Sequence, residues 1–434
     1  MWCRLPLMLL AMLSLSQLKA QQVKHVIIVT IDGFRPDFYL DSTWKANNIR
    51  ELMKTGTYTL GMNSVFPSMT YPSHTTIITG VQPAKHGIYY NSIFEPTGST
   101  GKQYWNAGSI KVPTLWCLAK EKGLKVSSIL WPVSAEAPVD YNIPDIGGLG
   151  ESIRAQYSRP AGFTDTVQKL LLGGRGFDLA RDVQTAQIAA HVIEVNKPNL
   201  MTVHLLGVDH FEHEEGRDGP QVRQAVAGAD SGIAIIAKAL RTAGIWENTV
   251  LIVTGDHGFV DVKQVISPNL WLIKAGLITN IETNDWKAQF YSVSGSTYLY
   301  LRNPKDKQTL SRVKKILAEL PEEEKKLFRI IDREKLSAVG GNPEVAFALA
   351  GENGTSFDNR LTGTIIRPGK GGAHGFFPDF QEIRTGFVAV GPGITKGGVI
   401  GSMNERDIAP SVAKMLNLNL KKHDGKIPAE LFVK

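Results

Sequence analysis

Residues 23–32, VKHVIIVTID, form an almost unbroken β-branched run that ends in an aspartate. Such a run is typical of a strand that is buried on both faces of a parallel sheet. Similar runs recur at residues 126–130, 200–206, 250–253 and 386–390. Helical patterns lie between them, at residues 183–195 and 222–243. The alternation predicts a doubly wound α/β fold, with a mostly parallel central sheet and helices on both faces.

Two segments are expected to be insertions on this frame. Residues 140–180 are punctuated by glycine and proline and are expected to form a loop or lid. Residues 260–370 contain an alternating strand pattern at 295–301 and a charged amphipathic helix at 310–320. These patterns predict a small α+β subdomain within one larger domain.

The beginning of the chain has the pattern of a secretory signal. Arg4 precedes an apolar run at residues 5–15, and Ala20 is a small residue at a suitable cleavage point. We therefore expect cleavage near Ala20 and a secreted or periplasmic protein. With only 2 cysteines in the 434 residues, Cys117 would remain, and we expect it to be a buried structural thiol in a helix.

Composition excludes several classes of protein. No run after residue 20 is apolar and long enough to predict a membrane span. The net charge of +7 is mild and dispersed along the chain, which argues against specific nucleic-acid recognition.

Residues that commonly bind metals follow the predicted strands. They are Asp32, Asp209, His213, Asp256, His257 and His374. Three carboxylates and three imidazoles divide naturally into two sites that suit Zn²⁺, with other divalent transition metals as alternatives. Asp209 and His213 are spaced i, i+4, so one helical turn directs both toward one ion, whereas His210 lies on another side of that turn.

Residues 66–80, FPSMTYPSHTTIITG, supply candidates for a nucleophile. The segment predicts a turn that leads into a helix, where free N–H groups and the helix dipole favour an anionic phosphate. A nearby metal ion lowers the pKa of a hydroxyl group and so activates it. Spacing alone does not choose among Thr70, Ser73, Thr75 and Thr76.

Seven segments resemble the nucleotide pyrophosphatase/phosphodiesterase family of the alkaline phosphatase superfamily, in particular a bacterial secreted member. They are IDGFRPD at 31–37, FPSMTYPSHTTIITGVQPAKHGI at 66–88, YYNS at 89–92, LWPVSAE at 130–136, GVDHFEHEEG at 207–216, TGDHGF at 254–259 and GGAHGFFPD at 371–379. The resemblance implies an alkaline-phosphatase-like catalytic domain over residues 21–434. It also implies phosphodiester or pyrophosphate hydrolysis with two zinc ions and a covalent phospho-threonine.

The resemblance also assigns roles to individual residues. It makes Thr70 the nucleophile and places it on one zinc ion with Asp32, Asp256 and His257. It places the other zinc ion on Asp209, His213 and His374. Asn91 matches the side chain that helps the Thr70 amide to hold a phosphate oxygen. Tyr71 matches an aromatic residue, usually Phe, that packs against a nucleobase.

Alternative functions remain open at this point. Asn91 is a neutral donor, which favours a small-molecule diester or nucleotide over a more highly charged phosphomonoester. A phosphonoacetate hydrolase would use much of the same ligand set. From another class, a catalytically silent binding protein could retain the fold, although the intact Thr70 and ligand residues argue against it.

Overall fold

The computed structural model describes residues 22–98 and 100–433. The expected signal peptide lies outside these residues. An eight-stranded sheet forms the centre, in the order β20-β2-β19-β7-β1-β6-β4-β5. Its strands are β1 His25–Ile31, β2 Thr57–Thr59, β4 Val126–Ile129, β5 Tyr141–Ile143, β6 Leu200–Leu205, β7 Thr249–Thr254, β19 Phe387–Val390 and β20 Gly398–Ile400. The five β-branched runs that predict strands are therefore all strands of one sheet.

One strand of this sheet runs against the others. The five neighbouring strands from β5 to β7 are parallel, as the buried apolar runs predict. β19 is antiparallel to β7, with Phe387 opposite Thr254. The start of β19 therefore lies at the edge of the sheet where the parallel strands end.

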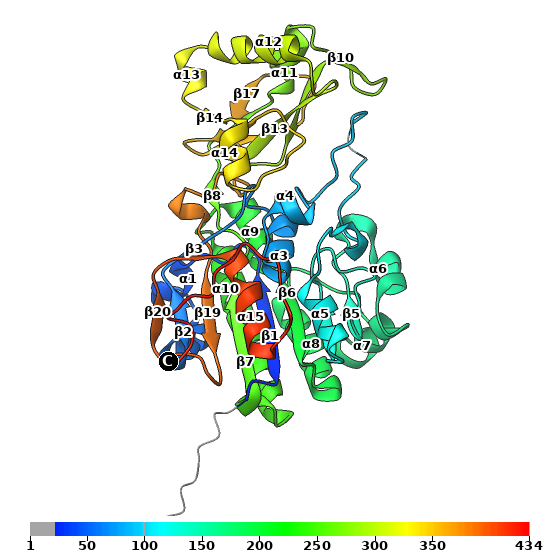
Figure 1. Ribbon diagram of the computed structural model, residues 1–434, viewed down its shortest axis with the longest axis vertical. Coiled ribbons are helices and arrows are strands. Elements are labelled where there is room, and N and C mark those ends of the chain that lie inside the picture. Colours follow the sequence, from blue (N-terminus) through cyan, green and yellow to red (C-terminus); the bar gives the residue numbers. More distant parts are fainter. Residues whose placement is uncertain (1–21, 99, 434) are drawn as a thin grey trace, which may run out of the picture.

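Helices cover both faces of the sheet because alternate side chains of the strands point to opposite sides. On one face, Ile27 and Val29 of β1 join a cluster with α2 Asn47–Thr55, α8 Asp182–Asn196 and α10 Pro220–Thr242. On the other face, Val26 and Ile28 join a cluster with α3 Thr70–Thr79, α5 Leu115–Glu121 and α15 Ile408–Leu416. Figure 1 shows α15 crossing in front of β1, and α3 and α9 at the end of the sheet that faces a second lobe.

The second lobe stands beyond that end of the sheet (Figure 1). Its antiparallel sheet has the order β12-β13-β15-β14, with β12 Ala288–Ser292, β13 Ser296–Leu301, β14 Phe328–Ile331 and β15 Ala348–Gly351. Its helices are α11 Asn269–Lys274, α12 Lys307–Ala318, α13 Glu322–Lys325 and α14 Arg333–Ala338. This lobe has a separate apolar core, which includes Trp271, Leu299 and Phe347.

Shorter elements complete the two lobes. Residues 140–180, for which a loop or lid is expected, contain β5, α6 Glu151–Tyr157 and α7 Phe163–Leu171. The other α-helices of the described residues are α1 Asp37–Leu40, α4 Pro83–His86 and α9 Gly207–Glu215. The other strands are β3 Met62–Asn63, β8 Val260–Asp261, β9 Gln264–Ile266, β10 Ile278–Asn280, β11 Asp285–Trp286, β16 Thr355–Phe357, β17 Ile366–Pro368, β18 Gly372–Ala373 and β21 Met403–Asn404.

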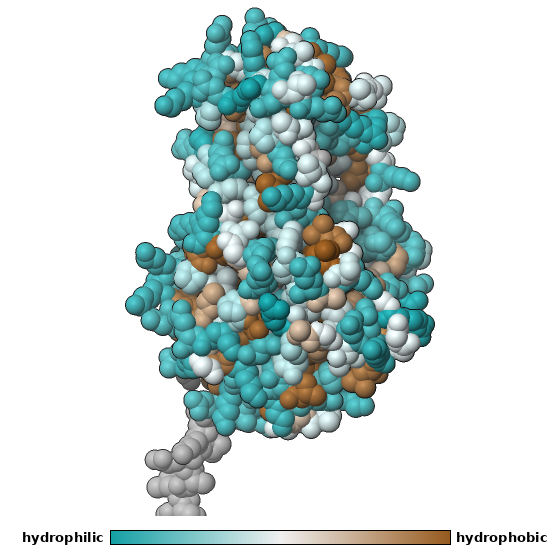
Figure 2. Space-filling model, turned by 90° about the vertical axis from the view of Figure 1, so that its right-hand side faces the viewer, coloured by the Kyte–Doolittle hydropathy of each residue, from teal (hydrophilic) through white to brown (hydrophobic). Residues whose placement is uncertain are grey.

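The surface and the free thiol complete the description. Figure 2 shows apolar side chains in small separate patches on the face that it presents. Within the described ranges, no helix is long and apolar enough to cross a membrane.

Cys117 lies in α5 as predicted, but it is partly exposed rather than buried. The buried residues of this helix are Leu115, Trp116 and Ala119, so Cys117 lies beside its core-facing stripe.

Candidate active site

The predicted ligand residues meet at the edge of the central sheet where the parallel strands end. Asp32 directly follows β1, and Asp256 and His257 follow β7. Asp209 lies in the first turn of α9, which follows β6. His374 lies between β18 and β19, and the antiparallel direction of β19 brings it to this same edge. Four segments that are far apart in the sequence therefore contribute to one cluster.

Asp32, Asp256 and His257 form one group, with ligand atoms that all lie within 4.8 Å of one another. His257 Nε2 is 3.2 Å from Asp32 Oδ1 and 3.3 Å from Asp256 Oδ2. Both oxygens are buried and have no hydrogen-bond partner among the described residues. Buried carboxylate oxygens of this kind are costly unless a cation neutralises them. The group therefore fits a metal ion.

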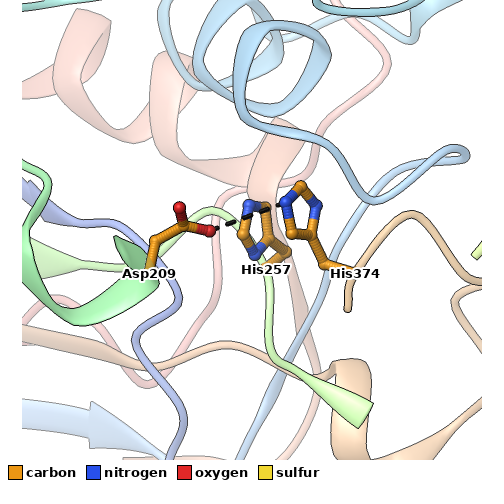
Figure 3. A group of neighbouring side chains, drawn as sticks. All are labelled: Asp209, His257 and His374. Carbon is orange, nitrogen blue, oxygen red and sulfur yellow. Dashed lines mark ion pairs between the residues drawn. The ribbon is translucent and has the colours of Figure 1, made fainter. Parts of the chain in front are cut away.

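Asp209, His257 and His374 form a second group with the same spacing. Figure 3 shows the three side chains together, with a dashed line that joins Asp209 Oδ1 to His374 Nε2, which are 3.5 Å apart. The rings of His257 and His374 are stacked, with centroids 3.7 Å apart. His257 therefore belongs to both groups by distance, whereas the family resemblance assigns it to the Asp32 site only.

His213 lies one helical turn after Asp209 on α9. Its Nε2 is 3.4 Å from Asp209 Oδ1, as the i, i+4 spacing predicts. Its Nδ1 is 3.1 Å from the Gly372 carbonyl oxygen, and His374 Nδ1 is 3.0 Å from that of Ser68. When Nδ1–H donates to a carbonyl, the tautomer is fixed and Nε2 is left as a ligand atom. Both imidazoles are therefore oriented for metal binding.

The pKa values of Asp209 and Asp256 indicate a need for positive charge. Burial raises the pKa of Asp209 and of Asp256 well above the usual value, and the charge of Asp32 adds to this effect. Burial acts on Asp32 in the same direction, but the neighbouring His204 and His257 side chains bring its pKa well below the usual value. Bound cations would allow all three carboxylates to ionise together.

The helix α3 presents one of its hydroxyl groups to this cluster. Thr70 is the first residue of α3, and its Oγ1 is 3.5 Å from His257 Nε2. The other hydroxyl groups that the sequence leaves open have other partners, namely Ser64 for Ser73, the Tyr71 carbonyl for Thr75 and His86 for Thr76. The tertiary structure thus distinguishes four hydroxyl groups that the spacing cannot.

Asn91 lies beside the start of α3. Its Oδ1 accepts a hydrogen bond from the Tyr71 backbone N–H at 3.0 Å. Because the amide oxygen is used in this way, the amide NH₂ group is left as a donor. The N-terminus of a helix favours an anion. Thr70 and Asn91 therefore border a position that suits a phosphate group.

The side chains of Tyr71 and His210 have their partners outside the metal-ligand cluster. The Tyr71 ring is 4% exposed within a small apolar cluster, and its hydroxyl group donates to Gln103 Oε1 at 3.3 Å. Gln103 and Trp105 also line a cavity of about 490 Å³. His210 is exposed and pairs with Glu214 at 3.7 Å, so it points away from the ligands, as the sequence predicts.

Two buried histidines at the site were missed by the sequence analysis. His74 bonds through Nδ1 to the Thr70 carbonyl at 2.8 Å and through Nε2 to Thr30 Oγ1 at 2.7 Å. His204 Nε2 is 3.0 Å from Asp32 Oδ2. A signal was present for each: His74 follows Thr70 by one helical turn, and His204 interrupts an apolar strand.

Comparison with known proteins gives a family. The family model described as type I phosphodiesterase / nucleotide pyrophosphatase matches residues 26–359. Human ectonucleotide pyrophosphatase/phosphodiesterase family member 1 is 26% identical over 265 residues, which cover 59% of this chain and 26% of that protein. Venom phosphodiesterase CdcPDE of Crotalus durissus collilineatus is 23% identical over 418 residues, which cover 92% of this chain and 45% of that protein. The chain thus spans less than half the length of these curated relatives.

Solved structures agree with the fold. A structure of inactive murine ectonucleotide pyrophosphatase/phosphodiesterase 5 in complex with AMP superposes with a TM-score of 0.69 at 20% identity. The match covers 93% of this chain and 97% of that chain. The human protein of the same name matches with a TM-score of 0.68 at 18% identity, over 93% and 97% of the two chains. The alkaline-phosphatase-like α/β fold that the motifs predict is thereby confirmed.

Proposed function

Because the chain belongs to the type I phosphodiesterase / nucleotide pyrophosphatase family, we propose that it is a two-zinc hydrolase that cleaves phosphodiester or pyrophosphate bonds. Nucleotides and related small diesters are the proposed substrates. The observation that carries the proposal is the position of the Thr70 hydroxyl group, 3.5 Å from His257 at the centre of two groups of metal-ligand type. A relative in complex with AMP supports a nucleotide as substrate.

The described residues fit zinc by their donor chemistry. Asp32, Asp256, His257 and Thr70 would hold one ion, and Asp209, His213 and His374 the other. Mixed imidazole and carboxylate ligands suit Zn²⁺, and other divalent transition metals suit them next best. When bound, the two ions supply positive charge that stabilises the attacking and leaving oxygens and lowers the pKa of the hydroxyl group and of water.

The proposed reaction consists of two successive displacements at phosphorus. In the first, Thr70 Oγ1 gives up its proton to solvent and bonds to phosphorus, the bond from phosphorus to the leaving oxygen breaks, and the leaving alcohol takes up a proton or the nucleoside phosphate departs as the anion. In the second, a water molecule gives up a proton as its oxygen bonds to phosphorus, the bond to Thr70 Oγ1 breaks, and Thr70 Oγ1 takes up a proton. Asn91 holds a non-bridging oxygen through its amide NH₂ group, because its Oδ1 is held by the Tyr71 N–H. Positioning and charge stabilisation are the main requirements of such a transfer.

One experiment separates the proposed function from its alternatives. The purified protein is assayed with a nitrophenyl diester, a nitrophenyl monoester and phosphonoacetate. We expect the diester to be turned over fastest, and both a chelator and Thr70→Ala to remove most of this activity. Asn91→Ala should lower the rate by roughly 10- to 1,000-fold, because it removes one donor to the developing charge.

Ser73→Ala is the matched control, since Ser73 lies on the same helix but its hydroxyl group bonds to Ser64. It should retain most of the activity. Equal or faster turnover of the monoester, or of phosphonoacetate, would assign the protein to one of those alternative activities. A protein that binds less than one transition-metal ion per chain and turns over none of the three would be a silent binding protein.

We also propose that the protein is secreted or periplasmic and is cleaved near Ala20. The n-region at Arg4 and the apolar run at 5–15 support this proposal. N-terminal sequencing of protein recovered from the medium or the periplasm of an expressing bacterium checks it. Recovery only from the cytoplasm, with Met1 intact, would contradict export.

A further inference from the structure

His204 is a polar residue at the centre of the fold. It lies in β6 opposite Thr30 of β1 and is 0% exposed. Met201 and Val203 of the same strand belong to the apolar cluster on one face, so alternation directs His204 toward the other face. There its ring centroid is 4.3 Å from that of His74 of α3. A buried imidazole in such a position must find hydrogen-bond partners to offset the loss of water.

Both ring nitrogens of His204 face hydrogen-bond acceptors. Nε2 is 3.0 Å from Asp32 Oδ2, and Nδ1 is 3.0 Å from the Leu130 carbonyl oxygen. Leu130 directly follows β4 and has a φ of 55°, which is uncommon for a residue other than glycine. Such a conformation persists only where the surrounding structure holds it. The His204 ring therefore joins the ends of β1 and β4 through its contacts with Asp32 and Leu130.

The two carboxylate oxygens of Asp32 have different surroundings. Oδ2 is occupied by His204, whereas Oδ1 is buried without a hydrogen-bond partner in the described part of the chain. Oδ1 is also the oxygen that lies 3.2 Å from His257 Nε2. The carboxylate is thus fixed with one oxygen toward the cluster of ligand residues and the other toward β6.

We propose that His204 is a positioning residue of the metal site, which holds Asp32 so that Oδ1 is available to the ion shared with Asp256 and His257. The proposal rests on the two-metal function proposed above. Hydrogen-bonded partners of ligating groups typically change metal affinity by about 10- to 100-fold when they are removed. The role therefore predicts a change in zinc affinity that is separable from a change in stability.

The lengths of two amide side chains allow a sharp test. In His204→Gln the amide nitrogen reaches approximately the place of Nε2 and can still donate to Asp32. In His204→Asn it reaches approximately the place of Nδ1 and can donate only to Leu130. His204→Leu removes both contacts. If the contact with Asp32 matters for metal binding, Gln should rescue it and Asn should not.

The measurement is a zinc titration of metal-depleted full-length protein in competition with a chromophoric chelator, together with thermal unfolding. We expect His204→Leu and His204→Asn to weaken one of the two bound ions by about 10- to 100-fold. We expect His204→Gln to stay within about 3-fold of the unchanged protein, below the range that loss of such a contact produces. The control is His25→Leu, which removes a buried imidazole that donates to the Pro198 carbonyl at 2.8 Å, at the opposite end of β1. It should lower the melting temperature and leave both zinc affinities unchanged.

Two outcomes would overturn the role of His204. One is rescue by Asn but not by Gln, which would make the Leu130 contact the important one. The other is zinc binding equal to that of the unchanged protein in every variant, with lower melting temperatures only, which would leave His204 a structural residue. If the unchanged protein itself bound no zinc, the two-metal function would fail and this role with it. If it bound two ions and hydrolysed the diester, any failure would belong to His204 alone.

Discussion

At the residue scale, the chemistry open to a side chain depends on its hydrogen-bond partners. Thr75 and Thr79 donate their hydroxyl groups to carbonyl oxygens four residues earlier in α3, which satisfies them within the helix. Thr70 has the same functional group, but its hydroxyl lies against His257. The buried carboxyl groups also differ in their surroundings. For Asp182, burial predicts a measurable pH effect.

Asp182 accepts a hydrogen bond from the Gly207 N–H at 2.9 Å, and its Oδ2 has no partner among the described residues. Burial raises its pKa to about 7. Because the folded protein holds this proton more tightly than the unfolded chain does, the free energy of unfolding falls between about pH 4 and pH 7 and is level above. Asp182→Asn keeps the acceptor and removes the titration. We expect it to lessen that fall by about 1.4 kcal/mol per pH unit, to be measured by urea unfolding of metal-free protein at pH 5 and pH 8.

Asp230→Asn is the matched control for this measurement. Asp230 accepts the backbone N–H groups of Asn48 and Ile49, at 3.1 and 2.9 Å, and so caps α2. Its replacement should lower stability by a similar amount at both pH values. An Asp182→Asn variant whose stability runs parallel to that of the unchanged protein would show that Asp182 does not titrate in this range.

At the element scale, α9 is fixed to the turn after β1. Arg35, in that turn, pairs with Glu212 of α9 at 3.2 Å, and both side chains are buried. The backbone N–H of Gly33, in the same turn, donates to Asp256 Oδ1 at 3.2 Å. The turn therefore joins the element that carries Asp209 to the segment that carries Asp256. We expect the conformation of this turn to affect both groups of ligand residues.

Gly33→Ala tests this junction. Gly33 has a φ of 72°, and an added Cβ would lie 2.5 Å from Glu212 Oε2. Gly123→Ala is the control, because Gly123 has a φ of 75° but nothing within 4 Å of an added Cβ. The control should lose about 1–2 kcal/mol of unfolding free energy from the backbone alone. Gly33→Ala should lose more and should also bind zinc more weakly in the competition titration. Equal losses in the two variants would mean that Glu212 moves aside freely.

At the scale of the whole molecule, the cluster joins segments from residue 32 to residue 374. These segments come together only in the folded chain, so an unfolded chain has no such site. The three carboxylates also repel one another when no cation is present. The free energy of metal binding should consequently add to the free energy of unfolding of the protein.

Zinc should therefore stabilise the protein by mass action. At a free concentration of 100 times the dissociation constant, each site adds about 2.7 kcal/mol to the unfolding free energy. Thermal unfolding with added zinc and with a chelator measures the difference. Asp209→Asn should lose much of the gain, because one carboxylate of the second group is absent. A melting temperature that is the same with zinc and with chelator would contradict a built metal site.

The sequence predicts the parts of this molecule well because they depend on local patterns. The five buried strands follow from their continuous apolar runs, and the helices at 183–195, 222–243 and 310–320 follow from the period of their apolar residues. The antiparallel direction of β19 does not follow from its sequence. An apolar run of four or five residues predicts a buried strand but does not predict the direction of that strand relative to its neighbours. That direction is what brings His374 to the edge where Asp32 and Asp256 lie.

By itself, the sequence determined five strands of the central sheet, three helices and the ligand-type residues at strand ends, since these are properties of neighbouring residues. The family resemblance assigned Thr70, and the tertiary structure placed its hydroxyl group against His257. Only the tertiary structure showed that His257 is close to both groups and that His204 contacts Asp32. His204 and Asp32 are 172 positions apart, yet their side chains are 3.0 Å from each other. Contacts of that kind arise when strands from distant segments pair in a particular order, and no local pattern records that order.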